Sequence, residues 1–469
     1  MSTPVPARSD SAALPRLSRR TSGARPTAPV RIVHLGLGNF FRAHQAWYTD
    51  RSPDAAGWGI AAFTGRSASL ADALGPQDGL YTLVTRGAGG DGYKVLSSLS
   101  AVHAASDQAA WLRYLRSPQV VVITLTVTET GYCRRARGGL DTDRDDIRAD
   151  LEALRTGPTA LVTTAPARLM AGLLARRDAG SGALAVVPCD NLPGNGAAAE
   201  GVVLDLAALV DPSLSDWIRE HVSFVTTMVD RITPRTTDED RAAVAAATGL
   251  RDAAPVVTEP FAEWVLSGEF PAGRPAWDEA GARFVDDIAP FEERKLWLLN
   301  GVHSLLAYAG SLRGHQTVAE AMADPQCRVW VEEWWDDATR HLRLPVDEVT
   351  AYRAALLDRF TNPNIHHLLA QIASDGTQKL PVRIAPALRA ERASGRLPGG
   401  AVRVLAAWAL HLRGEGAPVA DAGARALTGM AERSPDDAAQ QVVSFVVPDL
   451  AGDSALVAAV HTEMTRLRP

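Results

Sequence analysis

The sequence predicts an α/β protein in which an N-terminal domain built on a parallel sheet precedes a mainly α-helical C-terminal domain. Short apolar runs rich in Val, Ile and Leu alternate with helix patterns up to Ala289, as in a parallel sheet covered on both faces. A Gly-x-Gly turn follows the first of these runs. From Phe291 onward the patterns are mostly helical and rich in Ala and Leu, so we expect the domain boundary between Ala289 and Pro290.

Length and composition indicate a globular protein of two or three domains. The chain has 469 residues, of which 46% are hydrophobic and 22% charged, and its net charge is −6. The basic residues are dispersed, so nothing favours a nucleic acid or a membrane surface as partner, and no apolar run is long enough to span a bilayer. The oligomeric state stays open, and a monomer is compatible with the sequence.

The cysteines and the N-terminal residues indicate where the protein works. Cys133, Cys189 and Cys327 are far apart and have neither a metal-ligand spacing nor a disulfide pattern, which suits a reducing cytoplasm. Residues 1–28 are rich in Ala, Arg, Pro, Ser and Thr and lack the apolar core of a signal peptide. We therefore expect a cytoplasmic protein with a disordered tail over these residues, and a transit peptide is the less favoured alternative.

The first ordered element is a β-rich apolar run at residues 30–35, which enters a glycine turn and a helix pattern. In such a unit backbone N–H groups and the helix dipole face a pyrophosphate, and the glycines let the backbone come close. The residues expected to bind a dinucleotide here are Gly36, Gly38, Asn39 and Phe40. The third glycine of the usual fingerprint is absent because Phe41 stands in its place, so a plain strand-to-helix turn is the alternative.

A second strand is predicted at residues 58–63. In dinucleotide sites an acid usually follows the glycines by about 20 residues and holds the adenosine ribose, but residues 55–71 contain no acid. Arg66 and two serines stand there and can accept a 2′-phosphate. These residues weaken the assignment of NAD over NADP, so we expect NAD and keep NADP as an alternative. Arg66 is otherwise a solvated loop residue.

Several later segments complete the expected α/β pattern. Strands are predicted at residues 83–85, 94–99, 120–127, 184–188, 225–229 and 256–258, and helices at residues 165–177, 197–209 and 211–221. Because ligands bind at the C-terminal ends of parallel strands, we expect Thr128 and Glu129 beside the cofactor. Asn191 and Asp230 each follow a strand in the same way, although a loop Asn is more often a turn former.

A strongly apolar helix pattern at residues 293–306 is interrupted by Lys295, Asn300 and His303. Burying a lysine costs several kcal/mol unless it is paired or neutral. At about 100° per residue, these side chains and Glu292 fall on one broad face of an α-helix. That face offers an amine base, an amide donor and an imidazole to a hydroxyl or carbonyl carbon. The alternative is an amphipathic helix with a snorkelling lysine and two satisfied core polar residues.

The remaining C-terminal segments are interpreted as packing elements. Helices are predicted at residues 317–323, 346–360 and 399–412. Trp330, Trp334 and Trp335 stand at helical spacing, which is typical of core packing rather than of a binding site.

Ordered stretches of this sequence resemble the long-chain mannitol dehydrogenases, a family of polyol and sugar-acid oxidoreductases. The stretches that carry the resemblance are residues 36–50, 124–133, 189–196, 228–234, 259–265, 273–277, 292–304 and 362–381. They cover most of the chain from Val30 to Pro381 in order, whereas the match beyond Gly414 is weak. The resemblance implies a Rossmann-like NAD(P)-binding domain at residues 29–289, an α-helical substrate and catalytic domain at residues 290–469, and a substrate cleft between them. It implies no metal, in agreement with the missing ligand spacing.

The resemblance also implies roles for individual residues. Lys295 resembles the catalytic base, Asn191 and Asn300 a pair of oxyanion-type donors, His303 a substrate-hydroxyl contact, Glu292 a proton-relay carboxylate and Asp230 a polar site residue. Such a set is chemically coherent, because a base must take the hydroxyl proton as hydride leaves for the nicotinamide. Neutral amide donors stabilise the developing alkoxide without repelling a lysine.

The segment at residues 370–381 bears on the substrate. Gln371 stands where mannitol-oxidising members are expected to have Arg, and the segment looks more like the mannonate branch, which reduces fructuronate. Lys379 and Arg383 can then receive a carboxylate, unless they are structural or solvent-facing. We expect an NAD(P)-dependent oxidoreductase acting on C2 of an acyclic hexitol or hexonate. The alternatives are a pentitol such as arabinitol, a phosphorylated hexitol such as mannitol 1-phosphate, or a non-catalytic dinucleotide sensor.

Overall fold

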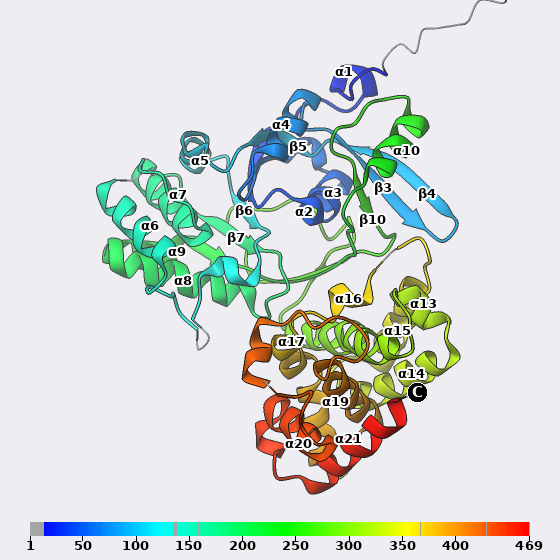
Figure 1. Cartoon of the computed structure of the whole chain (residues 1–469). Coiled ribbons are helices and arrows are strands. Elements are labelled where there is room, and N and C mark those ends of the chain that lie inside the picture. The colour runs from blue at the N-terminus through cyan, green and yellow to red at the C-terminus, as the bar shows by residue number, and fades with distance from the viewer. Residues whose placement is uncertain (1–13, 136–137, 158, 366, 428, 469) are drawn as a thin grey trace, which may run out of the picture. The chain divides into compact units, whose positions relative to one another are not determined.

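The computed structural model describes residues 14–135, 138–157, 159–365, 367–427 and 429–468 (Figure 1). The chain divides into two compact units: unit 1 comprises Met1–Arg86 and Gly90–Asp286, and unit 2 comprises Gly87–Gly89 and Asp287–Pro469. The division falls after Asp286 rather than after Ala289, so the expected boundary lies inside the first turn of helix α11 (Ala289–Arg294).

Unit 1 is built on a six-stranded parallel sheet of order β5-β2-β1-β6-β7-β8. Its strands are β1 (Val30–Leu35), β2 (Gly59–Phe63), β5 (Leu99–His103), β6 (Val122–Leu125), β7 (Leu184–Pro188) and β8 (Val222–Phe224). The strand order reverses between β1 and β6, which is the place where doubly wound sheets bind ligands. This sheet confirms the predicted α/β fold of the N-terminal part.

Helices lie on both faces of this sheet (Figure 1), and an apolar cluster packs on each face. The helices of unit 1 from α2 onward are α2 (Asn39–Ala43), α3 (Gln45–Arg51), α4 (Ser69–Leu74), α5 (Gln108–Leu115), α6 (Asp145–Thr156), α7 (Ala165–Ala179), α8 (Asn195–Val210), α9 (Pro212–His221) and α10 (Asp238–Thr248). Short 3₁₀ turns are η1 (Ala55–Gly57), η2 (Gly75–Gln77) and η3 (Glu129–Tyr132). Val33 belongs to one apolar cluster and its neighbour Ile32 to the other, as the alternation of side chains along a strand requires.

Two smaller three-stranded sheets complete unit 1. One has the order β10-β3-β4, with β3 (Tyr81–Gly87), β4 (Gly90–Leu96) and β10 (Val256–Thr258), and the other the order β12-β11-β9, with β9 (Thr226–Asp230), β11 (Glu263–Ser267) and β12 (Arg283–Phe284). The single strand expected at residues 94–99 is wrong, because β4 ends at Leu96 and β5 starts at Leu99. Between them the Ser97 N–H donates to the Asp50 carboxylate (2.9 Å) rather than to a strand, which interrupts the ladder.

The disordered tail expected over residues 1–28 is wrong for its described part, which begins at Leu14. The Leu17 side chain is fully buried, and its N–H donates to the Arg251 carbonyl (2.9 Å). Helix α1 (Arg19–Ser22) follows, and the Arg19 guanidinium donates to the carbonyls of Ser97 (3.2 Å) and Leu99 (3.0 Å). Composition missed this attachment because one leucine and one arginine with specific partners hold the segment. Residues 1–13 lie outside the described residues.

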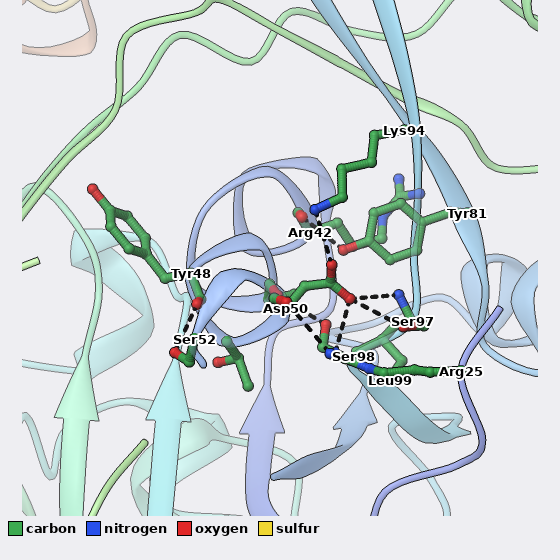
Figure 2. A network of polar contacts seen from close by, with 12 residues as sticks. Arg25, Arg42, Tyr48, Asp50, Ser52, Tyr81, Lys94, Ser97, Ser98 and Leu99 are labelled. Carbon is green, nitrogen blue, oxygen red and sulfur yellow. Dashed lines mark hydrogen bonds and ion pairs between the residues drawn. The ribbon is translucent and has the colours of Figure 1, made fainter. Parts of the chain in front are cut away.

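Figure 2 shows a second attachment of the same segment, a polar network around Asp50 of α3. Asp50 Oδ1 accepts hydrogen bonds from the Arg25 guanidinium (2.9 Å) and from the Ser97 N–H (2.9 Å), and the Lys94 ammonium lies 3.4 Å from Oδ2. The Asp50 side chain is only 7% exposed. A carboxylate at such a place requires cations and donors around it, and these come from the N-terminal segment and from the end of β4.

From Asp287 onward, the named elements among the described residues are all helices or helical turns, which confirms the predicted character of the C-terminal part. Besides α11 its helices are α12 (Val302–Leu305), α13 (Val318–Ala323), α14 (Pro325–Thr339), α15 (Val346–Phe360), α16 (Leu369–Ile372), α17 (Gly376–Arg383), α18 (Ala385–Ala393), α19 (Gly399–Leu412), α20 (Pro435–Val446) and α21 (Ser454–Leu467), with 3₁₀ turns η6 (Ala422–Leu427) and η7 (Pro448–Leu450). Helix α19 is the central one and packs against α14, α20 and α21. No helix of the described chain is both long and apolar enough to cross a bilayer.

The segment expected as one α-helix at residues 293–306 is wrong in its helix type. Two π-helical turns, η4 (Lys295–Gly301) and η5 (Leu306–Gly310), flank the short helix α12. In a π-turn the hydrogen bonds run from residue i to i+5 instead of i+4. The assumed rotation of about 100° per residue therefore does not hold between Lys295 and Gly301.

Candidate active site

Unit 1 contains a pocket of about 480 Å³ at the C-terminal ends of β1, β2 and β6. Gly36 follows β1, Arg66 follows β2, and Thr126–Thr128 follow β6. The residues that follow three neighbouring strands therefore line the same pocket. The other lining residues are Leu35, Gly65, Thr130, Gly131, Cys133, Arg144, Asp146, Thr163, Thr164, Ala165 and Arg168. The volume is typical of a cofactor or ligand site, and its place is the one expected from the strand order.

Glycine stands at positions 36 and 38 of the turn for different physical reasons. Gly36 has φ +107°, and a Cβ atom there would lie 2.1 Å from the Thr126 carbonyl oxygen. Gly38 has φ −146°, and a Cβ atom there would meet only the Gly36 carbonyl oxygen, at 3.6 Å. The fold therefore requires glycine at position 36. At position 38 glycine leaves space in which a ligand can approach the protein backbone.

The side chains after the turn are engaged with the protein. Asn39 Oδ1 accepts a hydrogen bond from the Arg42 guanidinium (2.7 Å), and the Phe40 ring stacks on His44 with centroids 4.9 Å apart. Phe41, at the place of the third glycine, is fully buried and stacks on His34 at 3.4 Å. Gly38, Asn39, Phe40 and Glu129 are not among the residues that line the pocket, whereas Gly36, Arg66 and Thr128 are.

Part of the pocket comes from residues at α6 and α7 that were not predicted as site residues. Thr164 is the N-cap of α7, its hydroxyl accepts from the Ala167 N–H (3.3 Å), and the helix N-terminus opens at the pocket. Arg168 follows one turn later, and burial lowers its pKa. Arg144 pairs with Asp146 (2.7 Å). The signal that was available is the Thr-x-Pro start of the predicted helix.

A buried carboxylate holds the loop that carries Asn191. Asp190 accepts hydrogen bonds from the Leu192 N–H (2.9 Å) and from the Tyr132 hydroxyl at the end of η3. Burial raises the pKa of Asp190 to about 6. Asn191 itself is exposed. Asp230, the other residue predicted at a strand end, is 3% exposed and ends β9.

In unit 2 the polar residues of the apolar helix pattern occupy a π-turn and the α-helix after it. Lys295 begins η4 and is 7% exposed, Asn300 stands at its sixth position and is half-buried, and His303 in α12 is 6% exposed. Glu292 precedes them in α11 and is half-buried. All of them belong to unit 2.

His303 lies in a cationic environment. Burial lowers its pKa well below the ordinary value, and the charges of His367, Arg383, Arg359 and Lys295 lower it further. The ring centroid of His367 is 4.8 Å away. His303 Nε2 is buried and has no hydrogen-bond partner among the residues described. The imidazole is therefore neutral at ordinary pH, and one ring nitrogen is available to a hydroxyl group.

The two cations proposed for a carboxylate differ in their surroundings. The Lys379 ammonium donates to the carbonyls of Ile372 (3.2 Å) and Ser374 (2.5 Å), so it holds the turn between α16 and α17. Arg383 instead lies 3.3 Å from the hydroxyl of Ser304, the residue next to His303. Gln371 is exposed. Of these three residues, Arg383 is the one that the structure brings close to His303.

A separate group in unit 2 has metal-ligand chemistry but does not fit a metal well. Ligand atoms of His315, Asp324 and Cys327 lie within 4.8 Å of one another. Asp324 already pairs with His315 (2.9 Å) and with the Arg313 guanidinium (2.5 Å), and it caps α14. A cation would have to displace the arginine, so the group is better described as a helix-capping network.

Comparisons with known proteins identify the family. Residues 30–279 match the mannitol dehydrogenase Rossmann domain and residues 287–468 match the mannitol dehydrogenase C-terminal domain.

D-mannonate oxidoreductase of Escherichia coli (strain K12) is 40% identical to this chain over 375 residues, which are 78% of this chain and 76% of that protein. D-arabinitol 4-dehydrogenase of Ralstonia nicotianae is 37% identical over 471 residues, 96% of this chain and 98% of that protein. The structure of Pseudomonas fluorescens mannitol 2-dehydrogenase in ternary complex with NAD and D-mannitol aligns with a TM-score of 0.80 and 35% identity over 96% of each chain. The chain therefore belongs to the mannitol dehydrogenase family of polyol and sugar-acid oxidoreductases.

Proposed function

We propose that this protein is an NAD(P)-dependent dehydrogenase that interconverts the C2 secondary alcohol of an acyclic hexonate, such as mannonate, with the 2-keto sugar acid. The observation that supports the choice of a hexonate is the positive charge of Arg359 and Arg383 around His303. A substrate carboxylate is stabilised by such surroundings, whereas a neutral hexitol gains nothing from them.

The proposed chemistry assigns each atom that moves. The hydride leaves C2 for the nicotinamide, and the hydroxyl proton goes to Lys295. A general base has to be the uncharged amine, and Lys295 is only 7% exposed. Asn300 and Asn191 are the proposed donors to the developing alkoxide, and His303 Nε2 accepts from or donates to another substrate hydroxyl. Glu292 is the proposed proton relay, and Asp230 a polar residue that supports the site.

The pocket of unit 1 is the proposed NAD site. The start of α7 offers a helix N-terminus for the phosphates. The Gly36 N–H is already bonded to the Phe63 carbonyl (3.0 Å), so Gly36 is proposed as a lining residue and Gly38 as a backbone contact. Arg66 lines the same pocket at the end of β2, where an acid would favour the free ribose hydroxyls. Arg66 therefore keeps NADP open as the cofactor, and Thr128 is a proposed contact on the other side of β1.

A hexitol is the second candidate substrate. The solved relative with a TM-score of 0.80 holds D-mannitol with NAD, and it spans 96% of both chains. Hexitol and hexonate share the C2 alcohol, so the same base and donors serve both, and only the group at C1 distinguishes them.

Arg383 provides the experiment that tests the proposed function. We measure kcat/KM for D-mannonate and D-mannitol in the wild type, in Arg383→Gln, and in the control Arg389→Gln, whose guanidinium pairs with Asp449 (2.7 Å). Losing a charged hydrogen bond costs about 1.5–3 kcal/mol, so Arg383→Gln should lose about 10- to 100-fold with mannonate and little with mannitol. Equal losses with both substrates, or a wild type that prefers mannitol, would contradict the hexonate.

A further inference from the structure

The π-turn η4 contains both the proposed base and a proposed donor. Lys295 is its first residue and Asn300 its sixth, so they are five positions apart. In an α-helix five positions correspond to about 500°, which leaves two side chains about 140° apart. In a π-turn residue i+5 is the hydrogen-bonded partner of residue i and lies one turn above it. The π-turn therefore aligns Lys295 and Asn300 on the same side of the helix.

Two tryptophans of α14 donate to carbonyls inside this turn. Trp334 Nε1 donates to the Trp297 carbonyl (2.8 Å), and Trp335 Nε1 donates to the Leu298 carbonyl (2.9 Å). Both indole side chains are fully buried. Where i+5 bonding passes into i+4 bonding, one carbonyl loses its regular partner, and an unpaired buried carbonyl costs about 1–3 kcal/mol. Indole N–H donors at two successive carbonyls of the turn can supply such a partner.

The position of Trp334 leaves little freedom. A Cβ atom at Gly301, the last residue of η4, would lie 2.6 Å from Trp334 Nε1. A Cβ atom at Gly400 of α19 would lie 2.5 Å from the Trp334 Cα. Helices α14 and α19 and the π-turn thus meet at two glycines, and the indole has no space to turn away from its carbonyl.

We propose that Trp334 and Trp335 are positioning residues for catalysis, because their indole N–H groups stabilise the π-helical register of η4 and thereby align Lys295 with Asn300. This inference rests on the proposed roles of those two residues. Trp330, on the same helix, provides a comparison: its ring lies near the guanidinium groups of Arg403 (5.2 Å) and Arg313 (5.6 Å). It has no indole hydrogen bond to η4 among the contacts of the described chain.

The kinetic test uses the full-length protein with Trp334→Phe and Trp335→Phe, and Trp330→Phe as the matched control. Phenylalanine keeps most of the ring and removes the N–H donor. Misplacing a catalytic group by about 1 Å costs about 100-fold, so we expect kcat to fall up to about 100-fold in the first two variants. KM and the dissociation constant of NADH should change less than about 3-fold, and the pH profile of kcat should shift because the surroundings of the base change. A fall in kcat no larger than in Trp330→Phe would overturn the inference.

Backbone hydrogen exchange separates this inference from the proposed function. It is measured without substrate on the peptide that contains residues 295–301. Faster exchange there in Trp334→Phe and Trp335→Phe than in Trp330→Phe supports the role in the π-turn, and unchanged exchange contradicts it. If Lys295→Ala keeps normal turnover, the proposed base is wrong, while the exchange result still reports on the π-turn.

Discussion

The glycine turn of unit 1 and the π-turn of unit 2 both carry proposed site residues, but they are specified in different ways. The glycine turn depends on one local backbone requirement, the φ of +107° at Gly36. The π-turn depends on indole donors 37 positions further along the chain, at Trp334 and Trp335, and on space left by Gly400. The comparison indicates that the backbone of the glycine turn depends on one glycine position, whereas the proposed alignment of Lys295 with Asn300 depends on side chains of another helix.

The largest expected effect concerns the base in the π-turn. Lys295→Ala should lower kcat by about 100- to 10,000-fold, the range of general acid–base catalysis. NADH affinity should stay the same, because the proposed cofactor pocket lies in unit 1. Steady-state kinetics and an NADH fluorescence titration measure the two quantities, with Lys94→Ala as the control. Turnover near the wild-type value at saturating substrate would exclude Lys295 as the base.

The next effect separates the two glycines of unit 1. Gly36→Ala places a Cβ atom 2.1 Å from a carbonyl oxygen at φ +107°, so we expect a loss of unfolding free energy of at least about 3 kcal/mol. Gly38→Ala should leave the melting temperature unchanged and weaken NADH binding by about 10-fold if the cofactor approaches this backbone. Thermal unfolding and NADH titration test both. Equal melting temperatures of the two variants would show that the Thr126 contact does not control the turn.

A third effect concerns the carboxylate behind the Asn191 loop. Burial raises the folded-state pKa of Asp190 from its ordinary value to about 6. The folded protein holds this proton more tightly than the unfolded chain does. The contribution of the protonated Asp190 to the unfolding free energy is therefore fully present below about pH 4 and is lost as the pH rises through about 6. The rise of the Asp190 pKa to about 6 corresponds to about 3 kcal/mol of unfolding free energy.

Asp190→Asn tests that pH dependence. The variant cannot titrate at this position, so the difference in unfolding free energy between wild type and variant should change between pH 4 and pH 6 and stay constant above pH 7. Urea unfolding at a series of pH values gives this difference. A difference that is independent of pH would contradict the raised pKa.

The smallest expected effect concerns cofactor choice in unit 1. Arg66→Ala should lower kcat/KM for NADP by about 10-fold, since a charged hydrogen bond contributes about 1.5 kcal/mol or more. The value for NAD should change by less than about 2-fold, because NAD has no 2′-phosphate. Steady-state kinetics with both cofactors decide this, and equal changes would exclude Arg66 as a contact of the 2′-phosphate.

Much of the fold was predictable because its signals are local. The strand at residues 30–35 and the helices at residues 346–360 and 399–412 were predicted with the bounds that the structure has. The N-terminal attachment was not predictable, because the partners of Leu17 and Arg19 lie far away in the sequence. The same reason hid Arg144 and Arg168, which reach the pocket only through the packing of α6 and α7.

In the candidate site, too, the features with local sequence signals were predictable and the features that depend on tertiary contacts were not. Lys295, Asn300 and His303 were recognisable as polar residues inside an apolar pattern, and the structure places them together within unit 2. Their relative orientation was not recognisable, because helical geometry of about 100° per residue is the only assumption available without tertiary contacts. The π-turn corrects that angle, and the tryptophans interpreted as core packing are buried and in addition hydrogen-bonded to it.

The most direct test of the central claim is the absorbance of reduced nicotinamide when the wild-type protein is supplied with D-mannonate, D-mannitol or D-arabinitol, each with NAD and with NADP. We predict turnover with D-mannonate at the highest kcat/KM and a lower value with D-mannitol. A preference for D-arabinitol would contradict the hexonate assignment, and no turnover with any of the three would contradict the proposed dehydrogenase and favour a dinucleotide-sensing protein.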